Sequence, residues 1–125
     1  MDMCPCGGGQ AYAVCCQPLH EGKVAETAEA LMRSRYCAYV LKLYDYLRQT
    51  WHSSMCPVEL QDDENMQWLG LKIKRFEQQD ESHAMVEFVA RYKVNGRAFR
   101  LHETSRFVKE HGVWLYVDGL FNEEA

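Results

Sequence analysis

Residues 84–108 have the sequence AMVEFVARYKVNGRAFRLHETSRFV, and this stretch decides the fold class. The run from residue 84 to 94 predicts a β-strand, and Asn95-Gly96 is the strongest hairpin signal in the chain because both residues tolerate positive φ. A two-residue turn there fixes the strand register. It places four pairs on one face of the sheet: Tyr92 with Phe99, Ala90 with Leu101, Phe88 with Glu103, and Val86 with Ser105. We therefore expect Glu103 and Ser105 to be the polar members of an otherwise apolar, concave face.

Two further strands are predicted beside this hairpin. Before it, Leu69, Leu71 and Ile73 alternate with Gly70, Lys72 and Lys74, a period typical of a strand. After it, the loop at residues 110–112 determines which side chains join the face of Glu103. A loop of even length adds Trp114, Tyr116 and Asp118, whereas a three-residue loop adds Val113, Leu115 and Val117. We favour the first, which completes a four-stranded meander.

The first half of the chain has a helical period instead. Thr27 is the expected N-cap of a helix of about four turns, with Glu29 complementing the helix dipole in the first turn. Its apolar stripe consists of Leu31, Met32, Tyr36, Tyr39, Val40 and Leu43. Asp45 is the expected cap of a second, short helix from Tyr46 to about Trp51, an irregular segment follows Pro57, and residues 17–22 form a turn or loop. Helices followed by an antiparallel sheet predict an α+β domain over residues 23–125.

Four cysteines stand within the first sixteen residues: Cys4, Cys6, Cys15 and Cys16. This density predicts one zinc ion in a tetrahedron of thiolates, with the three glycines at 7–9 allowing a tight knuckle. The alternatives are a pair of disulfides or unrelated buried thiols. Adjacent cysteines are poorly placed for disulfide geometry, and cross-pairing requires an oxidising compartment. The N-terminus is acidic and lacks the apolar region of a signal peptide, so a cytoplasmic location is expected.

Length and charge bound the remaining options. A chain of 125 residues is about one domain, and the net charge is −4. Without a cluster of Lys and Arg in the sequence, neither nucleic acid nor an anionic membrane surface is an expected partner. Lys72, Lys74 and Arg75 are explained by a solvated sheet face. No stretch approaches the roughly eighteen apolar residues of a membrane span.

The spacing C-x-C-x8-C-C with a Gly-rich interior resembles the SEC-C motif of the SecA preprotein translocase. The rest of the chain resembles the small YchJ-like bacterial proteins. The segments that carry this second resemblance are residues 28–36, 50–52, 86–92, 101–103, 105–107, 114 and 116–119. Together these resemblances imply a zinc knuckle at residues 1–22 on a nuclear transport factor 2-like cone at 23–125, with one structural Zn2+. They imply a fold and a metal rather than an activity.

Two departures from the SEC-C pattern bear on partners. SEC-C motifs commonly carry lysines between the ligand pairs, which in SecA help to contact the chaperone SecB. Here residues 7–14 carry no charge, which weakens the case for a SecB-type or ribosomal partner. Some relatives have a second motif at the C-terminus, whereas this chain stops at residues 122–125 soon after the last expected strand, so one metal site is expected.

Cones of this kind enclose a pocket. The expected lining is Arg35, Tyr36, Tyr39, Trp51, His52, Glu103, Ser105, Tyr116 and Asp118. A carboxylate among aromatic rings has a raised pKa and can act as a general base, so Glu103, His52 and Asp118 are the catalytic candidates. The alternative is structural: Glu103 pairs with Arg35, His52 or Tyr36 because buried charges need partners.

We expect no catalytic or metal-binding role for the other histidines and cysteines. His20, His83 and His111 are placed at the surface or in loops, and His102 on the outer sheet face. Cys37 is expected to be a packed thiol, Cys56 a loop thiol, and Tyr12 to pack on the knuckle.

Three function classes remain. The favoured one is a metal-stabilised binding or adaptor protein, which recognises a protein or peptide through the surface around Tyr12, Val14 and residues 19–20, or a small ligand through the cone. The second is a small-molecule enzyme acting in the cone. The third is a structural zinc site on an interaction domain that forms homodimers. Four thiolates leave no coordination position for water, so the zinc is expected to be structural rather than catalytic.

Overall fold

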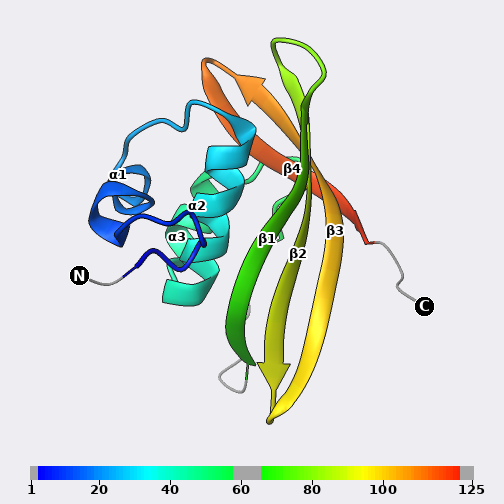
Figure 1. The fold of residues 1–125 in the computed structure, drawn as a ribbon. Helices are drawn as coiled ribbons and strands as arrows, with labels where there is room; N and C mark the ends of the chain where they lie inside the picture. Colours follow the sequence, from blue (N-terminus) through cyan, green and yellow to red (C-terminus); the bar gives the residue numbers. More distant parts are fainter. Residues whose placement is uncertain (1–2, 58–65, 122–125) are drawn as a thin grey trace.

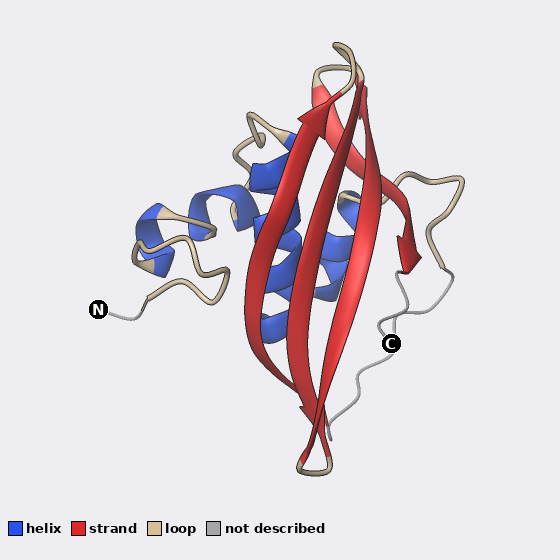
Figure 2. Cartoon of the chain, turned by 45° about the vertical axis from the view of Figure 1, so that its right-hand side comes forward, coloured by secondary structure: helices blue, strands red, loops and turns tan. Residues whose placement is uncertain are grey.

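The computed structural model describes residues 3–57 and 66–121, in which two helices lie on one face of a curved antiparallel sheet (Figure 1). The helices are α2 (Ala28–Leu41) and α3 (Tyr44–Gln49), and the N-terminal segment contributes η1 (Tyr12–Val14) and α1 (Gln17–His20). The strands are β1 (Met66–Gln78), β2 (His83–Val94), β3 (Arg97–Glu110) and β4 (Val113–Phe121), in the spatial order β1-β2-β3-β4. The predicted α+β meander is therefore confirmed. Figure 2 shows the helices behind the sheet and the N-terminal segment at its β1 edge.

The β2–β3 hairpin has the predicted register. Asn95 and Gly96 adopt φ values of 51° and 82°, as a two-residue turn with two left-handed positions requires. All four predicted pairs are present, including Phe88 with Glu103 and Val86 with Ser105. Glu103 and Ser105 consequently lie on the face covered by the helices, and both are buried.

The loop between β3 and β4 has an even length, as we favoured. Asp118 nevertheless lies on the outer face of the sheet, whereas we expected it on the inner face with Trp114 and Tyr116. His111 and Gly112 form the turn, and Glu110 pairs with Val113. Phe107 pairs with Tyr116 while Arg106 pairs with Asp118, so one extra residue is inserted in β4 between these pairs. Such a bulge reverses the alternation of all side chains beyond it. Trp114 and Tyr116 face inward as predicted, but Asp118 turns outward toward Arg106 and Gly119 takes the inner position.

Strand β1 is longer and less regular than the predicted alternation. Irregularities in pairing with β2 fall between Trp68 and Gly70 and between Ile73 and Arg75. Leu69 lies at the first of these irregularities and is 41% exposed, so the regular alternation expected from Leu69 to Lys74 is interrupted there. Leu71 and Ile73 do pack against the core, together with Trp68 and Phe76.

Helix α2 begins as predicted, since Oγ1 of Thr27 accepts a hydrogen bond of 3.0 Å from the backbone N of Ala30. The helix ends at Leu41, and its C-cap Lys42 has a left-handed φ of 62°. Leu43, which we expected in the apolar stripe of this helix, therefore lies outside the helix. Helix α3 begins one residue before Asp45, which therefore sits in its first turn rather than at its cap.

Two further sequence predictions concern residues 17–22 and the segment after Pro57. The segment expected to be a turn or loop at residues 17–22 contains the short helix α1, with Pro18 in its first turn, a position that Pro favours. The irregular segment expected after Pro57 and the C-terminal residues 122–125 lie outside the described residues. Within the described ranges, no helix is long and apolar enough to cross a membrane.

Candidate metal centre and cone pocket

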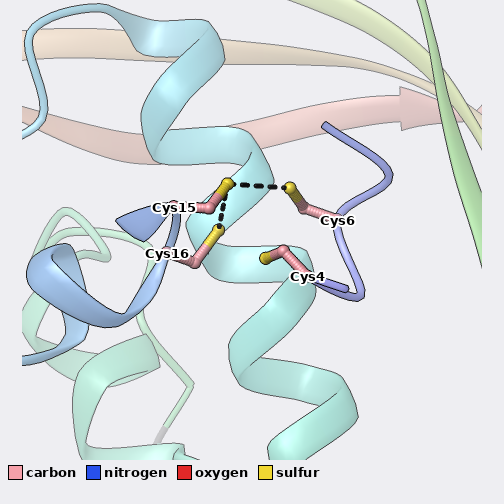
Figure 3. Close-up of side chains that lie close together, drawn as sticks. All are labelled: Cys4, Cys6, Cys15 and Cys16. Atoms are coloured by element: carbon pink, nitrogen blue, oxygen red, sulfur yellow. Dashed lines mark hydrogen bonds between the residues drawn. The ribbon is translucent and has the colours of Figure 1, made fainter. Parts of the chain in front are cut away.

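The four predicted ligands converge. The Sγ atoms of Cys4, Cys6, Cys15 and Cys16 all lie within 4.8 Å of one another, with Cys6 to Cys15 at 3.5 Å and Cys15 to Cys16 at 4.0 Å (Figure 3). None of them forms a disulfide. A metal–sulfur distance of about 2.3 Å in a tetrahedron separates the sulfurs by about 3.8 Å. The cluster therefore already has the dimensions of a tetrathiolate metal site.

A small backbone hairpin brings the first pair of ligands into place. Met3 and Ala11 form an antiparallel bridge, and the backbone N of Cys4 donates to the carbonyl of Gln10 at 2.8 Å. Gly7 turns the chain at a φ of 77°, a conformation that favours glycine. The turn η1 follows directly and places Cys15 and Cys16 against the first pair.

The electrostatics of the cluster call for a cation. Burial raises the pKa of Cys4. The pKa of Cys6 is raised by the neighbouring Cys16 thiol and by burial. The pKa of Cys16 is raised by the adjacent Cys37 thiol. Several thiolates in one buried site repel one another and lose their hydration. A bound metal ion reverses this balance, because it stabilises the deprotonated ligands. The donor set thus fits a thiolate-binding metal.

His20, which we expected at the surface or in a loop, instead lies in α1 and joins the knuckle to the body. Its Nε2 lies 2.8 Å from the carbonyl oxygen of Ser34, and its Nδ1 lies 2.7 Å from the hydroxyl of Tyr12. A carbonyl can only accept, so Nε2 carries the proton and Nδ1 accepts from Tyr12. Burial lowers the pKa of His20, which favours this neutral form. The available signal was Pro18, two residues after the last ligand, because Pro is common in the first turn of a helix and so predicts a helical turn that includes His20.

Arg33 and Cys37 on α2 complete the contact with the cluster. Arg33 Nη1 donates to the carbonyl of Cys6 at 3.0 Å. Cys37 is fully buried, as expected of a packed thiol, and its Sγ lies 3.9 Å from that of Cys4. Tyr12 packs against the cysteines as predicted. The remaining cysteine, Cys56, is a half-exposed loop thiol.

Beneath α2, the concave sheet face encloses a cavity of about 380 Å³ that is partly open to solvent. Six predicted pocket residues line it: Arg35, Tyr36, Tyr39, Trp51, Glu103 and Tyr116. Six apolar or aromatic residues complete the wall: Met32, Trp68, Leu71, Phe88, Ala90 and Leu101. Ser105 is buried and touches the site through Glu103, whereas His52 and Asp118 are not part of the lining.

Glu103 is satisfied by hydroxyl groups rather than by a cation. It is 6% exposed and accepts hydrogen bonds from Ser105 Oγ and from Tyr116 Oη, the latter at 3.2 Å. Burial raises its pKa, and the bonds from Ser105 and Tyr116 oppose this increase. None of the partners that we named, Arg35, His52 or Tyr36, forms a hydrogen bond with it in the described structure, although Arg35 lines the same cavity.

The other two catalytic candidates have partners elsewhere. His52 Nε2 lies 3.0 Å from a carboxylate oxygen of Glu110, and its Nδ1 bonds Ser54. Asp118 accepts two hydrogen bonds from the guanidinium of Arg106, at 2.6 and 2.5 Å, on the outer face. Glu103, His52 and Asp118 therefore do not converge on one reacting position.

Arg35 is a buried cation in the pocket wall. It is 2% exposed, and its Nη1 donates to the carbonyl of Leu47 at 2.9 Å and to Thr50 Oγ1 at 2.6 Å. Its guanidinium carbon lies 4.9 Å from the ring centre of Trp51 and 4.6 Å from that of Tyr116. Among the described residues, no carboxylate lies within ion-pair distance of it, and burial lowers its pKa. An isolated parallel β-bridge between the backbones of Trp51 and Tyr116 holds Trp51 in place.

The histidines on the sheet lie as expected: His83 and His111 are exposed, and His102 bonds Glu87 on the outer face. That outer face also holds a feature that the sequence did not show. A depression between the knuckle and the sheet is lined by four basic side chains and no acidic one. They are Lys72, Lys74, Arg91 and Arg100, which come from three different strands.

Comparison with known proteins supports both parts of the molecule. Residues 27–119 match the family model "YchJ, middle NTF2-like domain". A UPF0225 protein of Cupriavidus pinatubonensis is 58% identical over 98% of this chain and 90% of its own length. A UPF0225 protein of Ralstonia nicotianae is 59% identical over 93% of this chain and 89% of its own length.

Two solved structures have the same fold along nearly the whole chain. The solution structure of a SEC-C motif containing protein from Rhodopseudomonas palustris has a TM-score of 0.84 at 34% identity, covering 96% of this chain and 98% of that one. The crystal structure of a SEC-C motif containing protein from Psychrobacter arcticus has a TM-score of 0.77 at 28% identity, covering 98% and 84%. These matches confirm the expected nuclear transport factor 2-like fold and the resemblance to SEC-C motif proteins.

Proposed function

The chain belongs to the YchJ-like family of UPF0225 proteins, and from this premise we propose that it is a zinc-stabilised binding module. The observation that carries the proposal is the convergence of four thiol groups within 4.8 Å at the N-terminus. In this proposal the metal fixes the knuckle against α2, and the cone pocket and the adjoining surface bind a ligand or partner.

Zinc is the metal that best suits this donor set. Four cysteine thiolates in a tetrahedron are typical of structural zinc sites. Cys4, Cys6, Cys15 and Cys16 would hold the ion, whose charge stabilises the buried thiolates. All four coordination positions are then filled by sulfur, so no position remains for water or substrate, and the role of the metal is structural.

The surface around the knuckle supports a protein or peptide partner. Val14 is 67% exposed, and Leu19, five residues further along the chain, is half-buried. The knuckle residues Pro5 and Gly7 also form one wall of the basic depression. A peptide with acidic side chains complements this depression, and ordering of the knuckle by metal would keep its wall in place.

We favour binding over catalysis in the pocket because, of the three catalytic candidates, Glu103 lines its described part, whereas His52 and Asp118 do not. The pocket instead has the properties of a small-molecule binding site: a concave, largely apolar wall with a few polar groups.

The metal part of the proposal is tested by zinc content and by chelation. Purified protein should contain one zinc per chain, and Cys15→Ser should lower zinc affinity strongly, whereas the matched variant Cys56→Ser should bind zinc like the wild type. In amide NMR spectra, chelation should shift the signals of residues 3–20 and of the α2 residues that contact them, and leave the β2–β3 hairpin unchanged. Unchanged zinc affinity in Cys15→Ser, or unfolding of the whole chain on chelation, would contradict the proposal.

A further inference from the structure

A residue of the pocket wall carries a buried hydrogen-bond donor without an acceptor. In the described ranges, the indole Nε1 of Trp51 is the buried side-chain nitrogen or oxygen atom that lacks a hydrogen-bond partner. Trp51 lines the cavity, and its ring packs edge-on against Tyr116 at 5.1 Å. Buried N–H groups are rarely left unpaired. An acceptor supplied by a ligand would satisfy this one.

The same part of the wall carries a positive charge that no carboxylate contacts. Arg35 gives its two hydrogen bonds to neutral oxygens, and its guanidinium lies near the rings of Trp51 and Tyr116. Glu103 is the carboxyl group of the described lining, and it is held by Ser105 and Tyr116 instead. Buried charges are normally compensated. The arrangement of Arg35 and Trp51 therefore favours an anionic acceptor.

The rest of the wall specifies an apolar, flat body for the ligand. Aromatic rings of Tyr36, Tyr39 and Trp68 pack around one another, with centroid distances of 5.6 Å and 6.0 Å from Trp68 to the two tyrosines. The volume of about 380 Å³ is within the range of small-molecule sites. Aromatic walls pair well with an aromatic ring in stacked or edge-on contact.

We propose that the cone pocket binds a small aromatic carboxylate, whose ring packs among these aromatic side chains and whose carboxylate accepts hydrogen bonds from Arg35 and Trp51. This inference rests on the proposed binding function and gives the chemical class of the ligand. A planar carboxylate suits the two donors because charge-assisted hydrogen bonds to guanidinium and N–H groups are strong and directional.

The test compares an acid with its neutral analogue. Metal-loaded, 15N-labelled protein is titrated with 2-naphthoate and, separately, with 2-naphthamide, which has nearly the same shape without the charge. We expect 2-naphthoate to bind at least about tenfold more tightly, as expected for a charge-assisted bond. The indole N–H signal of Trp51 should move downfield on binding, and the Trp51→Phe spectrum identifies that signal.

Three variants separate the contributions. Trp51→Phe keeps a ring but removes the donor, so it should weaken 2-naphthoate about tenfold. It should weaken 2-naphthamide less, because the carbonyl oxygen of the amide is a neutral and therefore weaker acceptor. Ala90→Leu places bulk in the cavity and should weaken both probes. Its matched control, Ala98→Leu, is on an exposed position of β3 and should change neither.

Each contrary outcome is distinct. Equal affinity for the two probes would overturn the proposed ligand chemistry and leave the binding function standing. If 2-naphthoate, benzoate and cinnamate all fail to bind below about 10 mM, the ligand proposal and the pocket part of the proposed function both fail, while the metal assay still decides the metal part. Signal shifts confined to Lys72, Arg91 and their neighbours would show anion binding on the outer face and would also overturn the inference.

Discussion

Replacing Gly119 with alanine tests the placement of Glu103 most sharply. Gly119 lies on β4 opposite Ser105, on the inner face. A Cβ atom at Gly119 would overlap Oε2 and Cδ of Glu103 and would lie 2.7 Å from its Cγ. The carboxyl group must therefore move, and its hydrogen bonds with Ser105 and Tyr116 must lengthen or break.

The size of the effect follows from two contributions. Forcing a methyl group into a packed site costs about 1–3 kcal/mol, and each lost hydrogen bond adds about 1 kcal/mol. The neighbouring cavity gives the carboxyl group room to swing, which reduces the first contribution. We expect Gly119→Ala to lower the free energy of unfolding by about 2–3 kcal/mol, a large share of the total for a domain of this size.

The assay is urea unfolding of the metal-loaded protein. The matched control is Gly70→Ala, because there the nearest heavy atom to the new Cβ is Nη2 of Arg91, the flexible end of a side chain, at 3.4 Å. That variant should cost less than about 1 kcal/mol. In a Glu103→Ala background the clash partner is absent, so Gly119→Ala should then cost almost nothing, as a double-mutant cycle would reveal.

Two results would refute this reasoning. A cost for Gly119→Ala no larger than that of Gly70→Ala would show that Glu103 does not occupy the space beside Gly119. A cost that persists unchanged in the Glu103→Ala background would show that the strain arises from another neighbour or from the backbone.

Three further predictions follow from single contacts. Burial raises the pKa of Glu103 above its ordinary value of 4.5, so the folded chain holds this proton more tightly than the unfolded chain. Its contribution to stability is therefore full below about pH 4.5 and is lost as the pH rises through the folded-state pKa; urea unfolding across pH should show this loss in the wild type and not in Glu103→Gln. Tyr12→Phe removes the hydroxyl bonded to His20 and should speed amide exchange in residues 3–20 by about fivefold, corresponding to about 1 kcal/mol, without altering exchange in β2. Thr27→Ala removes the N-cap of α2 and should cost about 1 kcal/mol in urea unfolding, whereas an unchanged stability would show that the cap is not formed.

The hairpin register could be predicted because a two-residue turn determines which residues of the two flanking strands are paired, and therefore which side chains share a face. Asn95-Gly96 therefore placed Glu103 and Ser105 on the inner face without knowledge of the rest of the fold. The same argument failed for Asp118, since one inserted residue in β4 reverses the alternation. Gly119 was the sequence signal for this inserted residue, because glycine is expected at an inner position that has no room for a side chain.

The metal ligands could be predicted because they are close together in the sequence, whereas the contacts that anchor them could not. His20 bonds Ser34 and Arg33 bonds Cys6, and the partners in each pair are far apart in the sequence. Only the packing of the N-terminal segment on α2 brings them together. The basic depression escaped prediction for a related reason. Its side chains come from β1, β2 and β3, and only the pairing of these strands gathers residues that are dispersed along the chain.

We propose that four thiolates hold one zinc ion in a closed structural site. X-ray absorption spectroscopy at the zinc edge tests it most directly, because zinc–sulfur and zinc–nitrogen or zinc–oxygen distances differ. We expect a single shell of four sulfur atoms at about 2.3 Å in the wild type, and in Cys15→Ser a reduced sulfur count with a lighter ligand at about 2.0–2.2 Å. A wild-type spectrum with a nitrogen or oxygen ligand, or one that Cys15→Ser leaves unchanged, would contradict the account.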